Sequence, residues 1–303
     1  MASAPTVEID AQYRQLREEC GLVEWPARGL LVVSGPDAAE YLQGQLTNDT
    51  EAIGPGEWIY AALLDRKGHM QADMRVLRPG EGPELWLDLE PEGLAAATRH
   101  LQMYKIGREV EVEDASETHT LFSLIGPRAT EFARAVESPS LRTGVGVDLI
   151  VPLEERDRVR EALLAAGAVE VSAEAAEIVR VESGRPRFGA EMGTETMPAE
   201  AGIVEQAVSF TKGCYIGQET VARLHYRGKP NRHLRGLRLS APAAAGDPVR
   251  QGERELGTIG TAVLSPAHGP IALAILRREA EPGATVAVGE DGVTAEVVAL
   301  PFG

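Results

Sequence analysis

The segment from 212 to 219, Lys-Gly-Cys-Tyr-Ile-Gly-Gln-Glu, places Cys214 two residues from Lys212, between two glycines and close to a carboxylate. The thiolate is the reactive form of cysteine, and a cation near the sulfur favours it. The glycines permit unusual backbone dihedral angles and the close approach of a ligand. We therefore expect Cys214 to be a reactive thiol assisted by Lys212. The alternative is a structural turn around a buried cysteine.

Two further segments concentrate polar side chains around glycine. Residues 41–49, Tyr-Leu-Gln-Gly-Gln-Leu-Thr-Asn-Asp, offer many hydrogen-bonding groups in a short space, or form a polar turn that caps a helix. Residues 64–70 predict a charged hairpin between strands at 58–63 and 70–77, and a solvated turn is the default interpretation of such a hairpin. Asp73, inside the second strand, is a candidate catalytic residue if it points inward.

The fourth segment, residues 180–191, reads Arg-Val-Glu-Ser-Gly-Arg-Pro-Arg-Phe-Gly-Ala-Glu. Glu182 follows an apolar run, and a carboxylate in a buried position needs partners. One use is to accept two hydrogen bonds from a planar heterocycle rich in N–H groups, such as the amino-pyrimidinone edge of a pterin. The alternative is an internal salt bridge with Arg180, Arg185 or Arg187.

Composition limits the class of protein. The 303 residues are 44% hydrophobic and 25% charged, which is typical of a soluble globular protein. The net charge of −16 argues against direct binding to nucleic acid or to anionic membranes, although it allows a local basic pocket. Cys20 and Cys214 are far apart and form no CxxC pair, so we predict no metal site.

Targeting signals and several familiar motifs are absent from the sequence. Residues 1–10 have no basic and apolar regions of a signal peptide, and the apolar run 271–276 is too short to span a membrane, so we expect a cytoplasmic protein. There is no GxxxxGK[ST] phosphate loop, no HExxH metal motif and no GxSxG hydrolase elbow.

A weak internal repeat indicates two similar halves. Residues 31–42 and 122–133 each read as a strand, a Gly-Pro turn and a helix that begins after the proline. Each is followed by a strand–Pro–helix unit, at 85–104 and at 147–166. The pattern predicts two α+β lobes, unless the match is chance, since Gly-Pro is common before helices.

The pattern of predicted secondary structure changes near residue 234. Short β-rich runs then alternate with Gly, Pro and Asp turns, which predicts a small antiparallel barrel or sandwich. Residues 227–231 form the expected linker. We therefore divide the chain into a region of two intertwined α+β lobes, residues 1–229, and a C-terminal β-barrel domain, residues 230–303.

These segments, in this order, resemble the folate-binding YgfZ family, whose members are relatives of the glycine-cleavage T-protein, an aminomethyltransferase. The resemblance runs from about residue 29 into the C-terminal barrel and is carried by residues 42–49, 65–68, 180–186 and above all 212–219. It implies three subdomains around a central channel that holds tetrahydrofolate. The first two are the α+β lobes and the third is the small β-barrel.

The resemblance also implies roles for individual residues. Glu182 matches the glutamate that holds the pterin ring, and Arg232 lies near a folate-contacting arginine. The further cofactor contacts that we expect in the matching segments are Tyr215, Gln218, Gln45 and Asn48. The implied function is that of an accessory factor for the synthesis or repair of iron–sulfur enzymes, including tRNA-modifying ones, which requires Cys214 and transient contact with those enzymes or their assembly proteins.

A one-carbon transferase of the T-protein type is the alternative, so the sequence leaves open whether the protein is an enzyme. The T-protein carries an aspartate in a Gly-Gly-x-x-Asp-Asp segment that assists aminomethyl transfer. Asp73, five residues after Gly68, falls at or beside that position, but this chain lacks both the Gly-Gly pair and the Asp-Asp pair of that segment. T-proteins lack the octapeptide at 212–219, and the sequence therefore favours the YgfZ group. A third possibility is a scaffold that binds folate only as a sensor.

Overall fold

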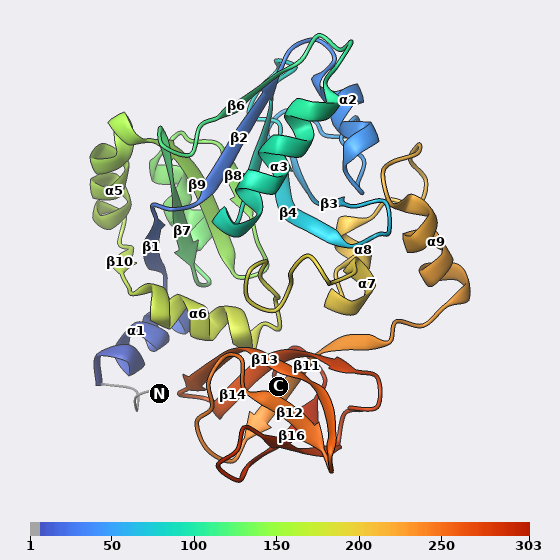
Figure 1. The fold of residues 1–303 in the computed structure, drawn as a ribbon. Helices are drawn as coiled ribbons and strands as arrows, with labels where there is room; N and C mark the ends of the chain where they lie inside the picture. Colours follow the sequence, from blue (N-terminus) through green and yellow to red (C-terminus); the bar gives the residue numbers. More distant parts are fainter. Residues whose placement is uncertain (1–6) are drawn as a thin grey trace.

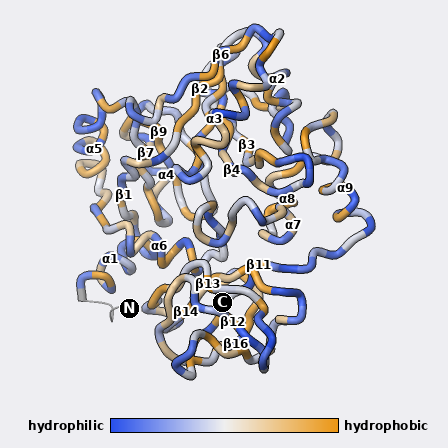
Figure 2. Tube along the Cα trace, viewed as in Figure 1, coloured by the Kyte–Doolittle hydropathy of each residue, from blue (hydrophilic) through white to orange (hydrophobic). Residues whose placement is uncertain are grey.

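The computed structural model describes residues 7–303, so the first six of the ten residues used above to exclude a signal peptide lie outside it. The described chain forms two five-stranded sheets and one closed barrel (Figure 1). Apolar residues are concentrated within the strands, whereas connections such as the link between α9 and β11 are hydrophilic (Figure 2). No helix in the described part is long and apolar enough to cross a membrane.

The first lobe is an antiparallel sheet that packs against two helices. In spatial order its strands are β3 (Trp58–Leu64), β4 (Met70–Leu77), β5 (Leu85–Leu89), β2 (Gly29–Ser34) and β6 (Glu111–Asp114). The helices are α2 (Ala38–Gln45) and α3 (Pro91–Tyr104), which share one apolar core with the sheet. In β4, Ala72, Met74 and Val76 enter this core, so the alternating residues Asp73 and Arg75 face the other way.

The second lobe has its own sheet and helices. In spatial order its strands are β10 (Val169–Glu170), β1 (Gly21–Trp25), β7 (His119–Ile125), β9 (Gly146–Pro152) and β8 (Ser140–Arg142). Its helical segments are α4 (Ala129–Phe132), the 3-10 turns η1 (Ala133–Ala135) and η2 (Leu153–Glu155), and α5 (Arg156–Ala165). Because β1 precedes β2 in the chain but joins this second sheet, the two lobes are intertwined.

The two Gly-Pro turns of the repeat have the same backbone requirement. Gly35 and Gly126 have φ angles of 106° and 132°, and a Cβ at either would lie 2.5 Å or less from a backbone oxygen. Glycine is therefore needed at both turns. The helices that follow differ, since α2 has eight residues and α4 only four before it tightens into η1. The predicted pair of similar α+β lobes is confirmed.

The C-terminal part is a closed antiparallel barrel, which decides between the two architectures predicted from the sequence. Its strands, in spatial order, are β11 (Arg232–Leu239), β14 (Gly269–Arg277), β13 (Arg254–Ser265), β12 (Pro248–Gln251), β15 (Thr285–Val288) and β16 (Val293–Val298). The proposed division of the chain at residues 229 and 230 falls in the segment between α9 and β11.

The remaining helices join the lobes to the barrel. Helices α1 (Val7–Glu18) and α6 (Ala173–Glu182) pack together beside the barrel strand β13 (Figure 1). Helices α7 (Pro198–Ala201), α8 (Val204–Ala207) and α9 (Gln218–Arg227) lie on the side of β3 and β4, where they build a shared apolar cluster. The sheets of the two lobes meet through Leu30 and Leu77 on one side and Leu121 and Ile150 on the other.

Candidate functional site

Two of the sequence-predicted segments meet at Lys212. Its Nζ donates hydrogen bonds to the backbone carbonyls of Gln43, Leu46 and Asn48, at 2.6, 2.7 and 3.0 Å. The octapeptide at 212–219 is thus anchored on the polar turn that follows α2. Burial lowers the pKa of the Lys212 ammonium to about 8, and the charges of the acidic residues that follow Asn48 offset only part of this shift.

The octapeptide also packs against the hairpin between β3 and β4. Gly217 has a φ of 86°, and a Cβ there would lie 2.6 Å from the carbonyl oxygen of Asp65. Gly68 at the hairpin has the same φ, and its Cβ would lie 3.0 Å from the Cβ of Thr220. These close approaches explain why both segments contain glycine, and they bring a third predicted segment to the same place.

Cys214 is exposed, which excludes the structural turn around a buried cysteine. Its neighbour Tyr215 is buried with Met70 and Phe188, and burial raises the pKa of the Tyr215 hydroxyl to about 12. An ammonium has three N–H donors, and Lys212 commits three hydrogen bonds to carbonyls. Lys212 therefore anchors the loop that presents the thiol, and its assistance to Cys214 stays a prediction.

The fourth segment places Glu182 somewhere else, between α1, α6 and the barrel. Its side chain is 2% exposed and accepts hydrogen bonds from Tyr13, at 3.1 Å, and from Ser265, at 2.5 Å. Arg17 forms an ion pair with it at 3.2 Å. The predicted salt-bridge partners in the same segment are therefore wrong. Both carboxylate oxygens are engaged, so pterin binding by Glu182 stays a prediction that these contacts do not favour.

Three of the other expected cofactor residues also have protein partners. Arg232 forms two hydrogen bonds of 2.9 Å with Glu200. Gln45 contacts His100 at 3.0 Å, and Asn48 donates to the carbonyls of Tyr60 and Gln206. Gln218 begins α9 beside the octapeptide. Among these residues, Asn48 and Gln218 lie with the anchored loop, whereas Arg232 lies on the first barrel strand.

A chain of buried ion pairs crosses between the two lobes. Asp88 of β5 binds Arg28 at 2.8 Å and Arg75 of β4 at 2.7 Å, and Arg75 also binds Asp148 of the second sheet. Burial alone would raise the pKa of Asp88, but the two arginines lower it to about 2. We did not predict this chain from the sequence, although charged residues within the apolar β4 and β5 strands are a usable signal.

Tyr60 and Asp73 lie near this chain, on the inner face of β3 and β4. The Tyr60 hydroxyl donates to Asp73 Oδ2, whereas the buried Asp73 Oδ1 has no hydrogen-bond partner. Burial removes solvent from the Asp73 carboxylate and so raises its pKa. Burial and the negative charge of Asp73 raise the pKa of Tyr60. A carboxylate with one unpaired buried oxygen is costly and is characteristic of a binding or catalytic site.

Arg185 lies in the same region. Its charge acts on Tyr60, and its own pKa is lowered by desolvation and by the neighbouring arginines Arg75 and Arg28. The residue is nevertheless exposed, and its guanidinium forms no ion pair with another residue of 7–303. Arg185 is therefore a free cation beside the Tyr60–Asp73 pair.

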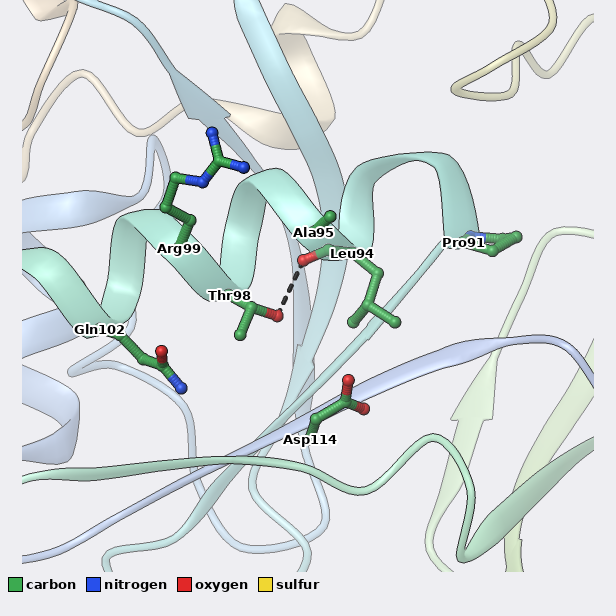
Figure 3. Close-up of a pocket in the computed structure, with 7 residues that line it drawn as sticks. All are labelled: Pro91, Leu94, Ala95, Thr98, Arg99, Gln102 and Asp114. Atoms are coloured by element: carbon green, nitrogen blue, oxygen red, sulfur yellow. Dashed lines mark hydrogen bonds between the residues drawn. The ribbon is translucent and has the colours of Figure 1, made fainter.

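A separate shallow groove of about 520 Å³ runs between α3 and β6 (Figure 3). Leu94 and Thr98 face Asp114 across it, and the Thr98 hydroxyl is already bonded to the carbonyl of Leu94 at 2.8 Å. None of the sequence-predicted site residues lines this groove. In residues 7–303 no group of three His, Cys, Asp or Glu side chains is placed to hold a metal ion.

Comparison with known proteins identifies the class. The family described as the GCVT N-terminal domain matches residues 5–144. An aminomethyltransferase of Rubrobacter xylanophilus is 28% identical over 97% of this chain and 86% of its own length. A tRNA-modifying protein YgfZ of an Enterobacter species is 27% identical over 90% of both chains. An uncharacterised Haemophilus influenzae protein is 31% identical over 68% of this chain and 69% of its own.

The fold agrees with these matches. The crystal structure of the glycine cleavage system aminomethyltransferase T from Bartonella henselae superimposes with a TM-score of 0.87, covers 97% of this chain and 89% of its own, and is 22% identical. The chain belongs to the T-protein-like family, with two α+β lobes and a C-terminal barrel.

Proposed function

We propose that this protein is a tetrahydrofolate-binding accessory factor of the YgfZ group, which supports the synthesis or repair of iron–sulfur enzymes in the cytoplasm through Cys214. The observation that carries the proposal is the presentation of this thiol. Cys214 is exposed on a loop whose position is fixed by the buried Lys212 and by Gly217. The named YgfZ relative supports the same group.

The residues between the lobes suit a folate. A pterin ring offers N–H donors, and Asp73 Oδ1 is a buried acceptor without a partner. Tetrahydrofolate, when bound, supplies a carrier for one-carbon groups. We propose that Asp73, rather than the fully engaged Glu182, is the principal pterin contact in this chain.

Tetrahydrofolate titration tests this part of the proposal. Wild type should bind, Asp73→Asn should bind at least about tenfold more weakly because it replaces a charge-assisted acceptor, and Glu182→Gln should change affinity little once its folding is verified. The absence of binding by wild type would overturn the folate role. A large affinity loss in a folded Glu182→Gln variant would return the pterin contact to Glu182.

The role of the thiol needs a functional readout. In a strain that lacks the gene, Cys214→Ser should fail to restore iron–sulfur enzyme activity, whereas Cys20→Ser should restore it. Full restoration of iron–sulfur enzyme activity by Cys214→Ser would contradict the proposed role of the thiol.

A one-carbon transferase is a second candidate, favoured by the raised pKa of Asp73 beside Tyr60. Such an enzyme would convert tetrahydrofolate and an aminomethylated lipoyl carrier into methylene-tetrahydrofolate, ammonia and the carrier in its dihydrolipoyl form. Turnover that is lost in Asp73→Asn and retained in Cys214→Ser would favour this candidate over the accessory factor.

A further inference from the structure

Five exposed cations gather around the start and the outer side of α9. They are Arg66, Lys67, Arg223, Arg227 and Lys229, and none forms an ion pair with another residue of the described chain. The protein as a whole carries a net charge of −16, so a group of unpaired cations in one place is unusual for it. We call these five residues and Tyr226 the α9 face.

The fold, and not only the sequence, brings these cations together. Arg66 and Lys67 form the tip of the β3–β4 hairpin, which packs on the beginning of α9 through Gly68 and Thr220. Arg223 and Arg227 are separated by one helical turn and therefore lie on one side of the helix. Lys229 follows in the hydrophilic link to β11 (Figure 2).

The acidic residues of the same two elements do not neutralise this charge. Asp65 and Glu219 are the carboxylates of the hairpin turn and of α9. Asp65 accepts hydrogen bonds from the backbone amides of Lys67 and His69, which lowers its pKa against the effect of burial. The hairpin turn, α9 and the link to β11 therefore carry five of these cations and two carboxylates, while Asp49 and Glu51 act on the buried Lys212 of the preceding loop.

Tyr226 lies three residues after Arg223 on α9 and belongs to an aromatic cluster. The ring of Phe210 stacks on His225 with centroids 4.0 Å apart, and Tyr226 meets both rings edge-on. Tyr226 remains 68% exposed. Aromatic and arginine side chains that stay accessible are the residues most enriched at protein interfaces. Cys214 lies on the loop between Phe210 and α9 and is exposed as well.

We propose that the α9 face docks an acidic segment of a partner protein and delivers it to Cys214. Complementary charge increases the rate of encounter and orients the partner, which is the useful contribution of a small basic patch on an acidic protein. A nucleic acid fits less well, since an extended polyanion reaches beyond the patch and meets the negative remainder of the molecule. The inference rests on the proposed use of Cys214 toward a protein partner and is independent of folate.

Peptides that carry a 2-pyridyl disulfide test the docking. The Cys214 thiolate attacks this disulfide, forms a mixed disulfide with the peptide and releases one pyridine-2-thione, whose absorbance gives the rate. Acidic, neutral and basic peptides of equal length are compared on the full chain. The acidic peptide should react about tenfold faster than the basic one at low ionic strength, and added salt should remove the difference.

Two charge-reversed variants complete the test. The double variant Arg223→Glu/Arg227→Glu should reverse the order of the acidic and basic peptides. The matched control Arg134→Glu/Arg142→Glu changes two exposed cations of the second lobe that form no ion pair with the described residues, and should keep the wild-type order. All substituted side chains are exposed, so the variants should fold, as circular dichroism would verify.

Three outcomes would overturn the inference. Equal rates for the three peptides, or equal behaviour of the two double variants, would remove the α9 face as a docking surface. An RNA oligonucleotide with the same reactive group that reacts faster than the acidic peptide would assign the surface to nucleic acid. Since the assay contains neither folate nor an iron–sulfur enzyme, failure here is distinct from failure of folate binding or complementation.

Discussion

The Nζ of Lys212 lies 2.7 Å from the carbonyl oxygen of Leu46, and this contact joins the octapeptide to the end of α2. The two residues belong to segments that are distant in sequence: Leu46 follows the last residue of α2, and Lys212 precedes α9 outside any helix or strand. A lysine with three acceptors can hold such a turn from one point, because its ammonium donates in three directions.

We predict that Lys212→Met destabilises the protein by about 3 kcal/mol, since it leaves buried carbonyls without donors. Lys212→Arg should not rescue it, because a planar guanidinium cannot replace a compact ammonium among three converging carbonyls. Urea unfolding measures both changes. The exposed Lys67→Met is the control and should stay within about 0.5 kcal/mol of wild type. A similarly small effect at Lys212 would contradict the anchoring role.

The lowered pKa of Lys212 makes the difference in unfolding free energy between wild type and Lys212→Met depend on pH. Burial shifts it from 10.5 to about 8, so between these values the unfolded chain holds more protons than the folded chain. Stability from this group therefore rises as the pH rises from 8 to 10.5, by up to about 3 kcal/mol. The difference in unfolding free energy between wild type and Lys212→Met should widen over this range, and a constant difference would show an ordinary lysine.

The two glycines that flank Cys214 and Tyr215 should differ sharply in their tolerance to alanine. Gly217→Ala requires a left-handed residue and a Cβ 2.6 Å from the Asp65 carbonyl, which predicts a loss of at least about 2 kcal/mol. Gly213 has no positive φ and open space around it, so Gly213→Ala should cost less than about 0.5 kcal/mol. Thermal unfolding of the pair decides, and equal losses would be inconsistent with the close approach at Gly217.

The raised pKa of Asp73 predicts a pH-dependent stability. The stability that this carboxyl contributes is complete below its unfolded pKa and is lost as the pH rises through the folded value. Asp73→Asn keeps an acceptor for Tyr60 and removes the charge, while its amide nitrogen takes the unpaired position of Oδ1. From pH 4 to pH 7 the unfolding free energy of wild type should therefore decline relative to that of the variant, as urea unfolding at both pH values would measure. A constant difference would mean that the charge is compensated in the folded state.

The sequence was sufficient for features that depend on local patterns. The Gly-Pro turns, the strand–Pro–helix units and the β-rich C-terminal region all follow from residue spacing, and the lobes and barrel are where these patterns put them. The role of Glu182 could not be obtained this way. Its partners Tyr13 and Ser265 lie in α1 and β13, so neither is visible from the residues around it.

The anchoring role of Lys212 is hidden from the sequence for the same reason. Lys212 and Cys214 are close in sequence, and that proximity indicates only a possible effect of the lysine on the thiol. The carbonyls of Gln43, Leu46 and Asn48 provide a better site for the ammonium, and that site exists only once the first lobe has folded. The alternation of Asp73 and Arg75 with apolar residues in β4 is, by contrast, a local signal of a polar face between the lobes.

The two cysteines should differ in reactivity to the extent that one acts as an internal control for the other. Cys20 is 0% exposed, and burial raises the pKa of its thiol to about 12, whereas Cys214 is exposed. Ellman's reagent should therefore label one thiol rapidly in the folded protein and the second only in denaturant. In Cys214→Ser the rapid phase should disappear, and in Cys20→Ser it should remain. Rapid labelling of the folded Cys214→Ser variant would show that the core around Cys20 opens readily, and a slow single thiol in Cys20→Ser would show that the Cys214 loop is closed in solution, which would remove the basis for a reaction with a partner protein.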